Sequence, residues 1–215
     1  FTIRYPFAVE TEVDGYTYSV QAPGVIDLAP GSAWALTTTS SFTFTEEEAV
    51  REQATSATVF ACPEKARADA DARWRELLAR GLAGVPEDPE LRKVAVKCMM
   101  TLIGNWRSAA GDLKRDGISP SISASYFASG FWAWDTWKQA AAVAHFDPEL
   151  AQESIRSMFD FQIEPDDPSR PQDDGMIIDC AFQKADENND RNSKPPLAAW
   201  AVWEVYKKSA DVGFL

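Results

Sequence analysis

The sequence has little histidine, little cysteine and no long apolar run. A single histidine, His145, stands among 215 residues, so neither a His-rich metal site nor a convincing Ser-His-Asp triad can be built from it. We expect no metal and no other cofactor. The three cysteines, Cys62, Cys98 and Cys180, are far apart and form no Cys-x-x-Cys pair, which leaves the redox compartment open. No apolar run approaches the roughly 20 residues of a transmembrane helix.

Basic residues are also scarce. Lys and Arg number 21 against 33 Asp and Glu, a formal net charge of −12. Nucleic acids and anionic membranes need clustered basic residues, so we expect neither as a partner. The chain begins at Phe1 without a start Met and stops at Leu215 just after a predicted helix, so we expect a piece of a longer protein. Its localisation is unknown; we prefer a periplasmic or secreted location to a cytoplasmic one.

The character of the sequence changes near residue 46. Before it, β-type and turn residues dominate: Asp14-Gly15 predicts a hairpin turn, and Ala33–Thr45 predicts a strand. We interpret residues 1–48 as the end of an antiparallel β-sandwich domain. Residues 49–87 are predicted to form a helical linker, whose charged helix runs from Pro63 to about Arg80.

Residues 88–215 predict consecutive helices. The first has Asp88 as its cap and Pro89 at its first position, and runs to about Ser108. Its apolar residues recur at spacings of three and four: Leu91, Val94, Ala95, Cys98, Met99, Leu102, Ile103 and Trp106. Further helices are predicted from Asp135 or Thr136 to about His145, from Asp147-Pro148, and from Lys194 after a Ser193 cap, with inward residues that include Phe159 and Trp200.

The connections between these helices alternate between short and long, which is typical of antiparallel helix pairs stacked into a ring. The predicted fold is therefore mainly α with an N-terminal β segment. It is a partial (α/α)6 toroid preceded by the end of an antiparallel β-sandwich. Residues 88–215 supply the first helices of that barrel, which needs about twelve helices to close, taking roughly 12 residues for each helix.

The stretch Phe131–Gln139 sets one carboxylate, Asp135, among three indoles, Trp132, Trp134 and Trp137. Indole faces pack against the C–H faces of sugar rings, and a carboxylate accepts hydrogen bonds from sugar hydroxyls, so a pyranose pocket needs both groups together. The alternative is a helix start with aromatic core residues and Asp135 as its N-cap.

The segment from Glu164 to Ser193 is long, polar and without helical periodicity, which in a compact domain indicates a functional or a disordered loop. It holds two dense polar clusters, 170–179 and 188–196, whose alternatives are a solvated acidic turn and a capped helix with a flexible lead-in. A calcium loop starting at Asp186 fails at its strict positions. Glycoside hydrolysis needs two carboxylates, and spacing alone does not choose among the loop candidates: Asp135, Asp173, Asp174 and Asp179.

Four motifs in order resemble bacterial members of glycoside hydrolase family 63: FWAWDTWKQ at 131–139, MFDFQI at 158–163, RPQDDG at 170–175 and RNSKPPLAAWAVW at 191–203. The resemblance covers about residue 90 to the end. It implies an inverting, exo-acting α-glucosidase that hydrolyses terminal α-linked glucose from oligosaccharides, on an (α/α)6 barrel behind a β-sandwich. The family's general acid, in a Glu-Ser-Gly-x-Asp motif, and its later Glu base do not occur here. We therefore expect no catalytic residue in this chain and both groups beyond Leu215.

The resemblance also implies substrate-binding residues. Trp134 and Asp135 match the family's Trp-Asp, which lines the subsite for the terminal glucose; Asp135 would bind hydroxyls and would not donate the proton. Lys194 precedes the double proline, where related trehalases have a Gln that contacts substrate, and Asn192 lies beside it. Gln172 and Asp173 are weaker candidates, because a loop at the mouth of the pocket fits them and so does simple loop structure. Phe131 and Trp137 are expected either as walls of the pocket or as core residues.

Other functions stay open at this point. A trehalase or a mannosylglycerate hydrolase would share the barrel and the inverting mechanism, although Lys194 in place of Gln argues against a trehalase. In a carbohydrate-binding or assembly protein, the general acid and base would be absent from the complete polypeptide as well. The expected partners are an oligosaccharide substrate and the remainder of the same polypeptide.

Overall fold

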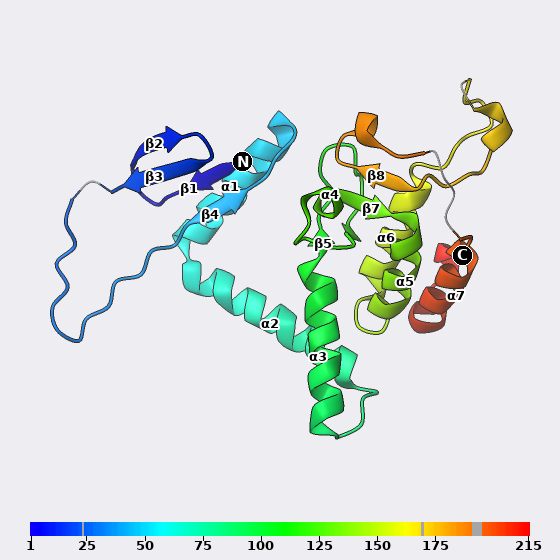
Figure 1. Ribbon diagram of the computed structural model, residues 1–215. Helices are drawn as coiled ribbons and strands as arrows, with labels where there is room; N and C mark the ends of the chain where they lie inside the picture. Colours follow the sequence, from blue (N-terminus) through cyan, green and yellow to red (C-terminus); the bar gives the residue numbers. More distant parts are fainter. Residues whose placement is uncertain (23, 169, 191–194) are drawn as a thin grey trace. The chain divides into compact units, whose positions relative to one another are not determined.

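The computed structural model describes residues 1–22, 24–168, 170–190 and 195–215. The chain divides into two compact units, Phe1–Asp71 and Ala72–Leu215 (Figure 1). The described residues form seven α-helices and four two-stranded sheets, so the protein is mainly α-helical, as predicted. The partial toroid, the end of a β-sandwich and the domain boundaries at residues 48 and 87 stay predictions. No helix in these ranges is long and apolar enough to cross a membrane.

The first unit contains two small antiparallel sheets. Strands β2 (Glu10–Asp14) and β3 (Thr17–Gln21) form the predicted hairpin, and Gly15 takes the positive φ of +57° that the turn requires. Strand β1 (Thr2–Arg4) pairs with β4 (Thr39–Ser41). The prediction of one strand over residues 33–45 is wrong, because only residues 39–41 find a partner strand and the earlier apolar positions stay exposed.

Helices α1 (Glu46–Ala61) and α2 (Pro63–Leu82) follow. Thr45 and Glu48 form a reciprocal capping box at the start of α1. The Glu48 backbone N–H donates to Thr45 Oγ1 at 3.2 Å, and the Thr45 N–H donates to Glu48 Oε2 at 3.3 Å. Helix α2 begins at Pro63, as predicted, and its last residues belong to the second unit.

Two helices of the second unit begin where the Asp-Pro signals predict. Helix α3 (Pro89–Gly104) is capped by Asp88, whose Oδ1 accepts from the N–H groups of Glu90 and Leu91 at 2.9 and 3.0 Å. Helix α6 (Pro148–Phe159) is capped in the same way by Asp147. Helix α3 ends at Gly104, earlier than predicted, because β5 (Trp106–Arg107) turns away to pair with β6 (Gly117–Ile118).

Helices α5 (Ala133–Val143), α6 and α7 (Ala198–Ser209) pack on one another and hold the core of this unit (Figure 1). Small residues on the packed faces, such as Ala140, Ala151 and Ser154, are buried and let the helices approach closely. The start predicted for the last helix is wrong: α7 begins at Ala198, because the double proline stays outside the helix. Its expected Ser193 cap lies outside the described residues.

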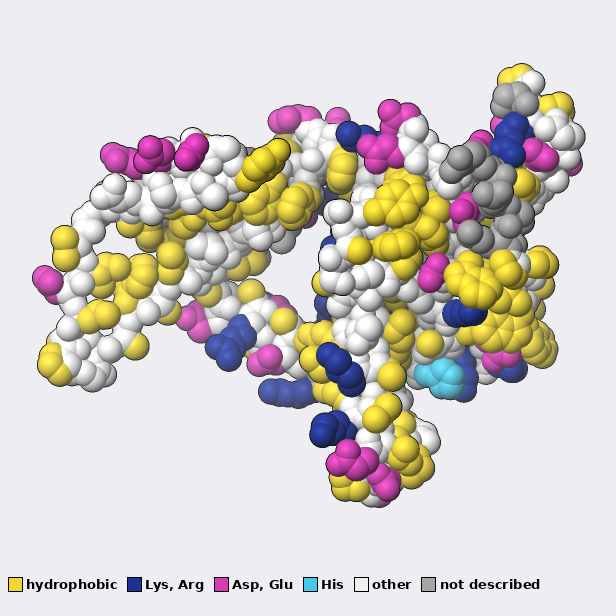
Figure 2. All heavy atoms as spheres, viewed as in Figure 1, with side chains coloured by type: hydrophobic (Ala, Val, Ile, Leu, Met, Phe, Trp, Pro, Cys, Tyr) yellow, Lys and Arg dark blue, Asp and Glu magenta, His cyan; other side chains and the backbone are white. Residues whose placement is uncertain are grey.

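The apolar stripes of helices α3, α6 and α7 are only partly buried. On α3, Met99 and Ile103 are buried, whereas Leu91 and Val94 are exposed by 51% and 60%. Phe159 and Trp200, both predicted to point inward, are exposed by 39% and 44%, because within the described structure one side of each stripe meets a packing partner. Hydrophobic side chains accordingly gather on the surface over α7, whereas over α3 they alternate with charged side chains (Figure 2).

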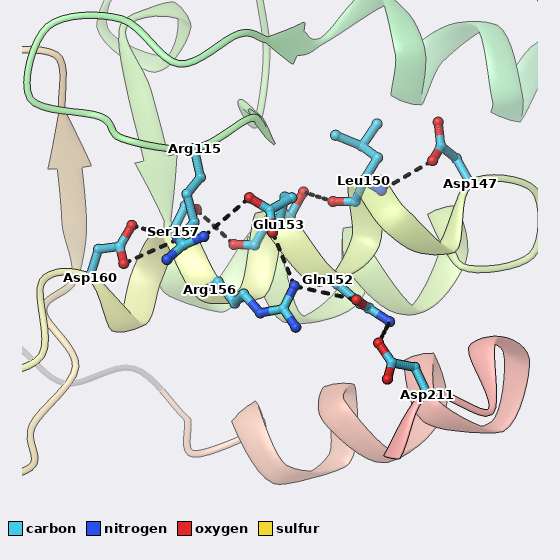
Figure 3. Close-up of polar contacts among 10 residues, drawn as sticks. Arg115, Asp147, Leu150, Gln152, Glu153, Arg156, Ser157, Asp160 and Asp211 are labelled. Carbon is cyan, nitrogen blue, oxygen red and sulfur yellow. Dashed lines mark hydrogen bonds and ion pairs between the residues drawn. The ribbon is translucent and has the colours of Figure 1, made fainter. Parts of the chain in front are cut away.

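A polar network ties the loop before β6 to helix α6 (Figure 3). Arg115 Nε donates to both carboxylate oxygens of Asp160, at 2.9 and 3.2 Å, and its Nη1 donates to Glu153 Oε2 at 3.3 Å. These hydrogen bonds, first of all those with Asp160, raise the pKa of Arg115. Gln152, the residue before Glu153 on α6, donates from Nε2 to Asp211 Oδ2 at 3.2 Å, which joins α6 to the segment after α7.

Gly117 tests the packing beneath these elements. A Cβ at Gly117 would lie 2.6 Å from Cζ of Phe131, a fully buried ring, so we expect Gly117→Ala to lower the free energy of unfolding by about 1–3 kcal/mol. Gly104→Ala is the matched control, because its Cβ would meet open space at the end of α3. Urea unfolding measures both, and equal midpoints for the two variants would contradict this packing.

His145 gives a pH test of the contact between α5 and α7. His145 is an exposed residue, yet partial desolvation and then the nearby Lys208 lower its pKa, while Glu204 acts in the opposite direction. The folded state therefore binds a proton less readily than the unfolded state. Stability is fully present above the unfolded pKa near 6.5 and is lost as the pH falls through the lower folded pKa. In urea titrations between pH 7 and 5 we expect His145→Gln to lose less stability than the wild type; parallel curves would contradict this.

Candidate functional site

Two short strands bring the Trp-rich motif beside the long polar segment. Strand β7 (Gly130–Trp132) pairs antiparallel with β8 (Cys180–Phe182), so that Phe131 lies opposite Ala181 and Trp132 opposite Cys180. A Cβ at Gly130 would collide with the carbonyl oxygen of Ala181, so only glycine permits this close approach. The pairing unites motifs that are about fifty residues apart in the sequence.

The ladder continues beyond the strands in both directions. The Ala133 N–H, at the start of α5, donates to the carbonyl oxygen of Asp179 at 3.0 Å. The carbonyl oxygen of Asn189 accepts from the N–H groups of Asp179 and Cys180 at 2.9 and 3.1 Å, and the Asn189 N–H donates back to Cys180 at 3.1 Å. The first turn of α5, residues 179–182 and residues 188–190 are therefore held as one hydrogen-bonded unit.

Asp135 lies in the first turn of helix α5. The N-cap is Trp132, which makes no side-chain cap hydrogen bond, so the alternative that made Asp135 the N-cap is wrong. The Asp135 side chain is half-buried. A carboxylate at this end of a helix interacts favourably with the partial positive charge of the helix dipole.

Trp134 is partly exposed, at 37%, next to Asp135. The Nζ of Lys138 lies 3.4 Å from the centroid of its ring, a cation–π contact one turn along the helix. This contact fixes the indole and occupies the face that meets the ammonium. A sugar ring would have to use the remaining surface of the indole.

Phe131 and Trp137 lie in the hydrophobic core. Their side chains are exposed by 0% and 2%, and Trp137 packs against Phe159 with ring centroids 6.1 Å apart. Neither ring face is open to a sugar in the described structure. Of the aromatic residues proposed for substrate binding, Trp134 is therefore the accessible one.

An aromatic cluster that sequence reasoning missed surrounds Trp132. The rings of Tyr126, Phe127 and Phe182 have centroids 5.5, 5.1 and 5.3 Å from that of Trp132. Tyr126 and Phe127, on the short helix α4 (Ser125–Ala128), are exposed by 58% and 40%. The signal in the sequence was a Tyr-Phe pair within a Ser- and Gly-rich loop, a place where large aromatic residues need a packing partner or a ligand.

Two buried polar atoms lie on α5 close to Asp135, and sequence reasoning missed them too. Thr136 Oγ1 and Gln139 Oε1 are buried without a hydrogen-bond partner among the described residues, although Gln139 Nε2 donates to the carbonyl oxygen of Ser119 at 3.3 Å. Buried polar atoms are normally paired. These two could pair with water or with ligand hydroxyls. Gln139 lies four residues after Asp135, on the same face of the helix, and this spacing was the available signal.

Arg170, in the first polar cluster, contacts acidic residues of both clusters. Its Nε donates to Asp173 Oδ2 at 2.8 Å, and its Nη1 reaches both the carbonyl oxygen and Oδ2 of Asp190, at 2.9 and 2.6 Å. These hydrogen bonds, first of all the one with Asp173, raise the pKa of Arg170. Gln172 is exposed beside Asp173 in the 3-10 turn η1 (Pro171–Asp173). Asn192 and Lys194 lie outside the described residues, so their roles stay predictions.

The chemistry that these groups offer is recognition. A half-buried carboxylate, an accessible indole and two buried polar atoms on one helix suit a polyhydroxylated ring. Among the described residues, no group of three His, Cys, Asp or Glu side chains is placed to hold a metal ion.

A comparison with protein families gives this site its context. Residues 128–215 match the family model of the mannosylglycerate hydrolase MGH1-like glycoside hydrolase domain. This segment is a glycoside hydrolase domain. It contains β7, α5, α6, β8 and α7, and thus Asp135 with the whole β7–β8 ladder. The match supports the resemblance to glycoside hydrolase family 63 at the level of a related family, and it supports a hydrolase that acts on glycosidic bonds.

The different surroundings of two indoles in the glycoside hydrolase domain can be tested by truncation. Trp137→Ala removes a buried ring, so we expect a loss of about 3–5 kcal/mol in the free energy of unfolding. Trp134→Ala should cost less than about 1 kcal/mol, because that side chain is already partly in water. Urea unfolding of both variants provides the measurement. Similar losses in the two would show that Trp134 is part of the core.

Proposed function

We propose that the protein is an inverting, exo-acting α-glucosidase that removes terminal α-linked glucose from oligosaccharides. The observation that carries the proposal is the placement of Trp134 and Asp135 in the first turn of α5, inside a glycoside hydrolase domain. The four motifs that resemble family 63 support the choice of an α-glucoside.

In this proposal Asp135 accepts hydrogen bonds from hydroxyls of the terminal glucose, and Trp134 packs against the ring. Thr136 and Gln139 offer a hydroxyl and an amide oxygen from the same helix. The β7–β8 ladder fixes the helix start, so these groups are in place before substrate arrives, which lowers the entropic cost of orienting the sugar.

The chemical step needs two further carboxyl groups. One protonates the glycosidic oxygen as the bond breaks, and the other removes a proton from a water molecule that attacks the anomeric carbon from the opposite face. In inverting enzymes these groups lie about 6.5–9.5 Å apart. We place both outside residues 1–215, in the remainder of the same polypeptide, and assign Asp135 to binding.

A second candidate is hydrolysis of mannosylglycerate, which the description of the matching family suggests. A trehalase would share the same mechanism, and a non-catalytic carbohydrate-binding protein would share the same pocket. Maltose, other glucose disaccharides, trehalose and mannosylglycerate form a substrate panel that separates these functions. This panel and the kinetic experiments below use the full-length polypeptide, which in this proposal carries the acid and the base.

The mechanism is tested by the anomer of the first product. We expect β-glucose to be released first from an α-linked disaccharide, followed by proton NMR before mutarotation. Release of α-glucose would contradict inversion. Turnover of mannosylglycerate alone would move the assignment to the second candidate, and sugar binding without turnover of any substrate would favour a binding protein.

The role of Asp135 is tested by Asp135→Asn, which keeps the size of the side chain and removes its charge. Losing one charged hydrogen-bond acceptor should lower kcat/KM for the α-glucoside by about 10- to 100-fold while the unfolding transition stays near that of the wild type. Asp166→Asn is the control, because Asp166 is an exposed carboxylate in the polar segment. Wild-type kinetics in Asp135→Asn would remove the residue from the substrate site.

A further inference from the structure

Arg170 joins two segments of the polar region through its guanidinium. We define the Arg170 clasp as Arg170, Asp173 and Asp190. Arg170 Nε lies 2.8 Å from Asp173 Oδ2, and Nη1 lies 2.6 Å from Asp190 Oδ2 and 2.9 Å from the Asp190 carbonyl oxygen. The Arg170 side chain is exposed by 22%, that of Asp173 by 27% and that of Asp190 by 48%, so the contact with Asp173 is partly shielded from water and the contact with Asp190 is open to it.

The two clasped segments have different anchors. Asp173 belongs to a loop that is closed at its base, where the Ile163 N–H donates to Met176 at 2.8 Å and the Gly175 N–H donates to Ile163 at 2.9 Å. Asp190 follows Asn189, which is bonded to β8 and through it to the start of α5. The clasp therefore connects the tip of the loop to the hydrogen-bonded unit that positions Asp135.

The Arg170 guanidinium also compensates two negative charges. Two carboxylates, from Asp173 and Asp190, share one cation. Without that cation they would be two like charges within reach of one another, and their repulsion would drive the loop tip away from Asp190. Arginine suits this position because its planar fork serves several acceptors at once, whereas a lysine ammonium is a single compact charge.

We propose that Arg170 is a positioning residue for substrate binding: the clasp holds the loop that carries Gln172 and Asp173 against residues 188–190 and so fixes the mouth of the sugar pocket. The inference rests on the proposed function. Arg170 does not touch the reacting atoms; it acts on KM by keeping one wall of the pocket in place.

The first experiment compares kinetics on maltose for the wild type, Arg170→Lys, Arg170→Gln and Arg170→Gln/Asp190→Asn. We expect Arg170→Gln to raise KM about 10-fold, the scale of one lost charged hydrogen bond, with kcat nearly unchanged. Arg170→Lys should lie between it and the wild type. The double variant should recover part of the loss, because the repulsion between carboxylates is gone. A wild-type KM in Arg170→Gln overturns the proposal.

Salt gives a second readout that an ordinary structural role would not move. Between 0.05 and 1 M NaCl, screening weakens the attraction in the wild type, so its KM should rise. The same screening weakens the repulsion in Arg170→Gln, so the KM of that variant should fall. Salt effects of the same sign in both proteins overturn the clasp.

A control and a substrate-free measurement separate this inference from the proposed function. Arg92→Gln removes an ion pair with Glu87 far along the chain from the polar region and should leave KM unchanged. Hydrogen exchange should show lost amide protection in residues 163–176 and 188–190 of Arg170→Gln and not of Arg92→Gln. If the wild type hydrolyses no α-glucoside, the proposed function fails. Unaltered hydrogen exchange in Arg170→Gln overturns the clasp, whether or not the wild type is active.

Discussion

The pairing of β7 with β8 is the constraint on which the rest of the site depends. It is only three residues long on each side, yet it joins Gly130–Trp132 to Cys180–Phe182 and extends through Asp179 into the start of α5. Closing so long a connection costs conformational entropy, and burial of the flanking side chains offsets that cost. Phe131, Cys180 and Ala181 are each exposed by no more than 1%, so the ladder is part of the buried interior.

This arrangement explains how a charged group can be held in a defined place at the end of a helix. Helix α5 has no side-chain cap at its N-terminus. Its first N–H groups are instead satisfied in part by the backbone next to β8, as in the bond from the Ala133 N–H to the carbonyl oxygen of Asp179. The first turn, which carries Asp135, is thereby anchored by a backbone hydrogen bond that extends the β7–β8 ladder.

Sequence reasoning succeeded where the determinants are local. The Asp88-Pro89 and Asp147-Pro148 signals predicted the starts of α3 and α6, and Asp14-Gly15 predicted the hairpin, because in each case the residues that form the cap or turn are adjacent in the chain. The glycoside hydrolase domain was indicated in another way, by the resemblance of four motifs to a known family.

It failed where the outcome depends on a distant partner. Helical spacing placed Phe159 and Trp200 on inward faces, but spacing does not say which side of a stripe meets another element, and both are substantially exposed. Strands of two or three residues carry no periodicity from which β7 and β8 could have been predicted. The same limit hid Tyr126 and Phe127, whose importance comes from their contact with Trp132 and not from their own neighbours in sequence.

Asp135 and Asp173 show why the sequence alone could not distinguish a carboxylate that binds a ligand from one that holds a loop in place. Asp135 and Asp173 looked alike in sequence, as acidic residues beside aromatic or amide side chains. In the structure, one oxygen of Asp173 accepts from Arg170 at 2.8 Å, and a carboxylate oxygen committed to a guanidinium has less capacity to accept from a sugar hydroxyl. This commitment agrees with the proposal that Asp173 and Asp190 hold the loop while Asp135 binds the sugar. Arg170 lies only three residues before Asp173, so that ion pair is local in sequence, whereas its contact with Asp190 joins segments 20 residues apart and could not be predicted from spacing.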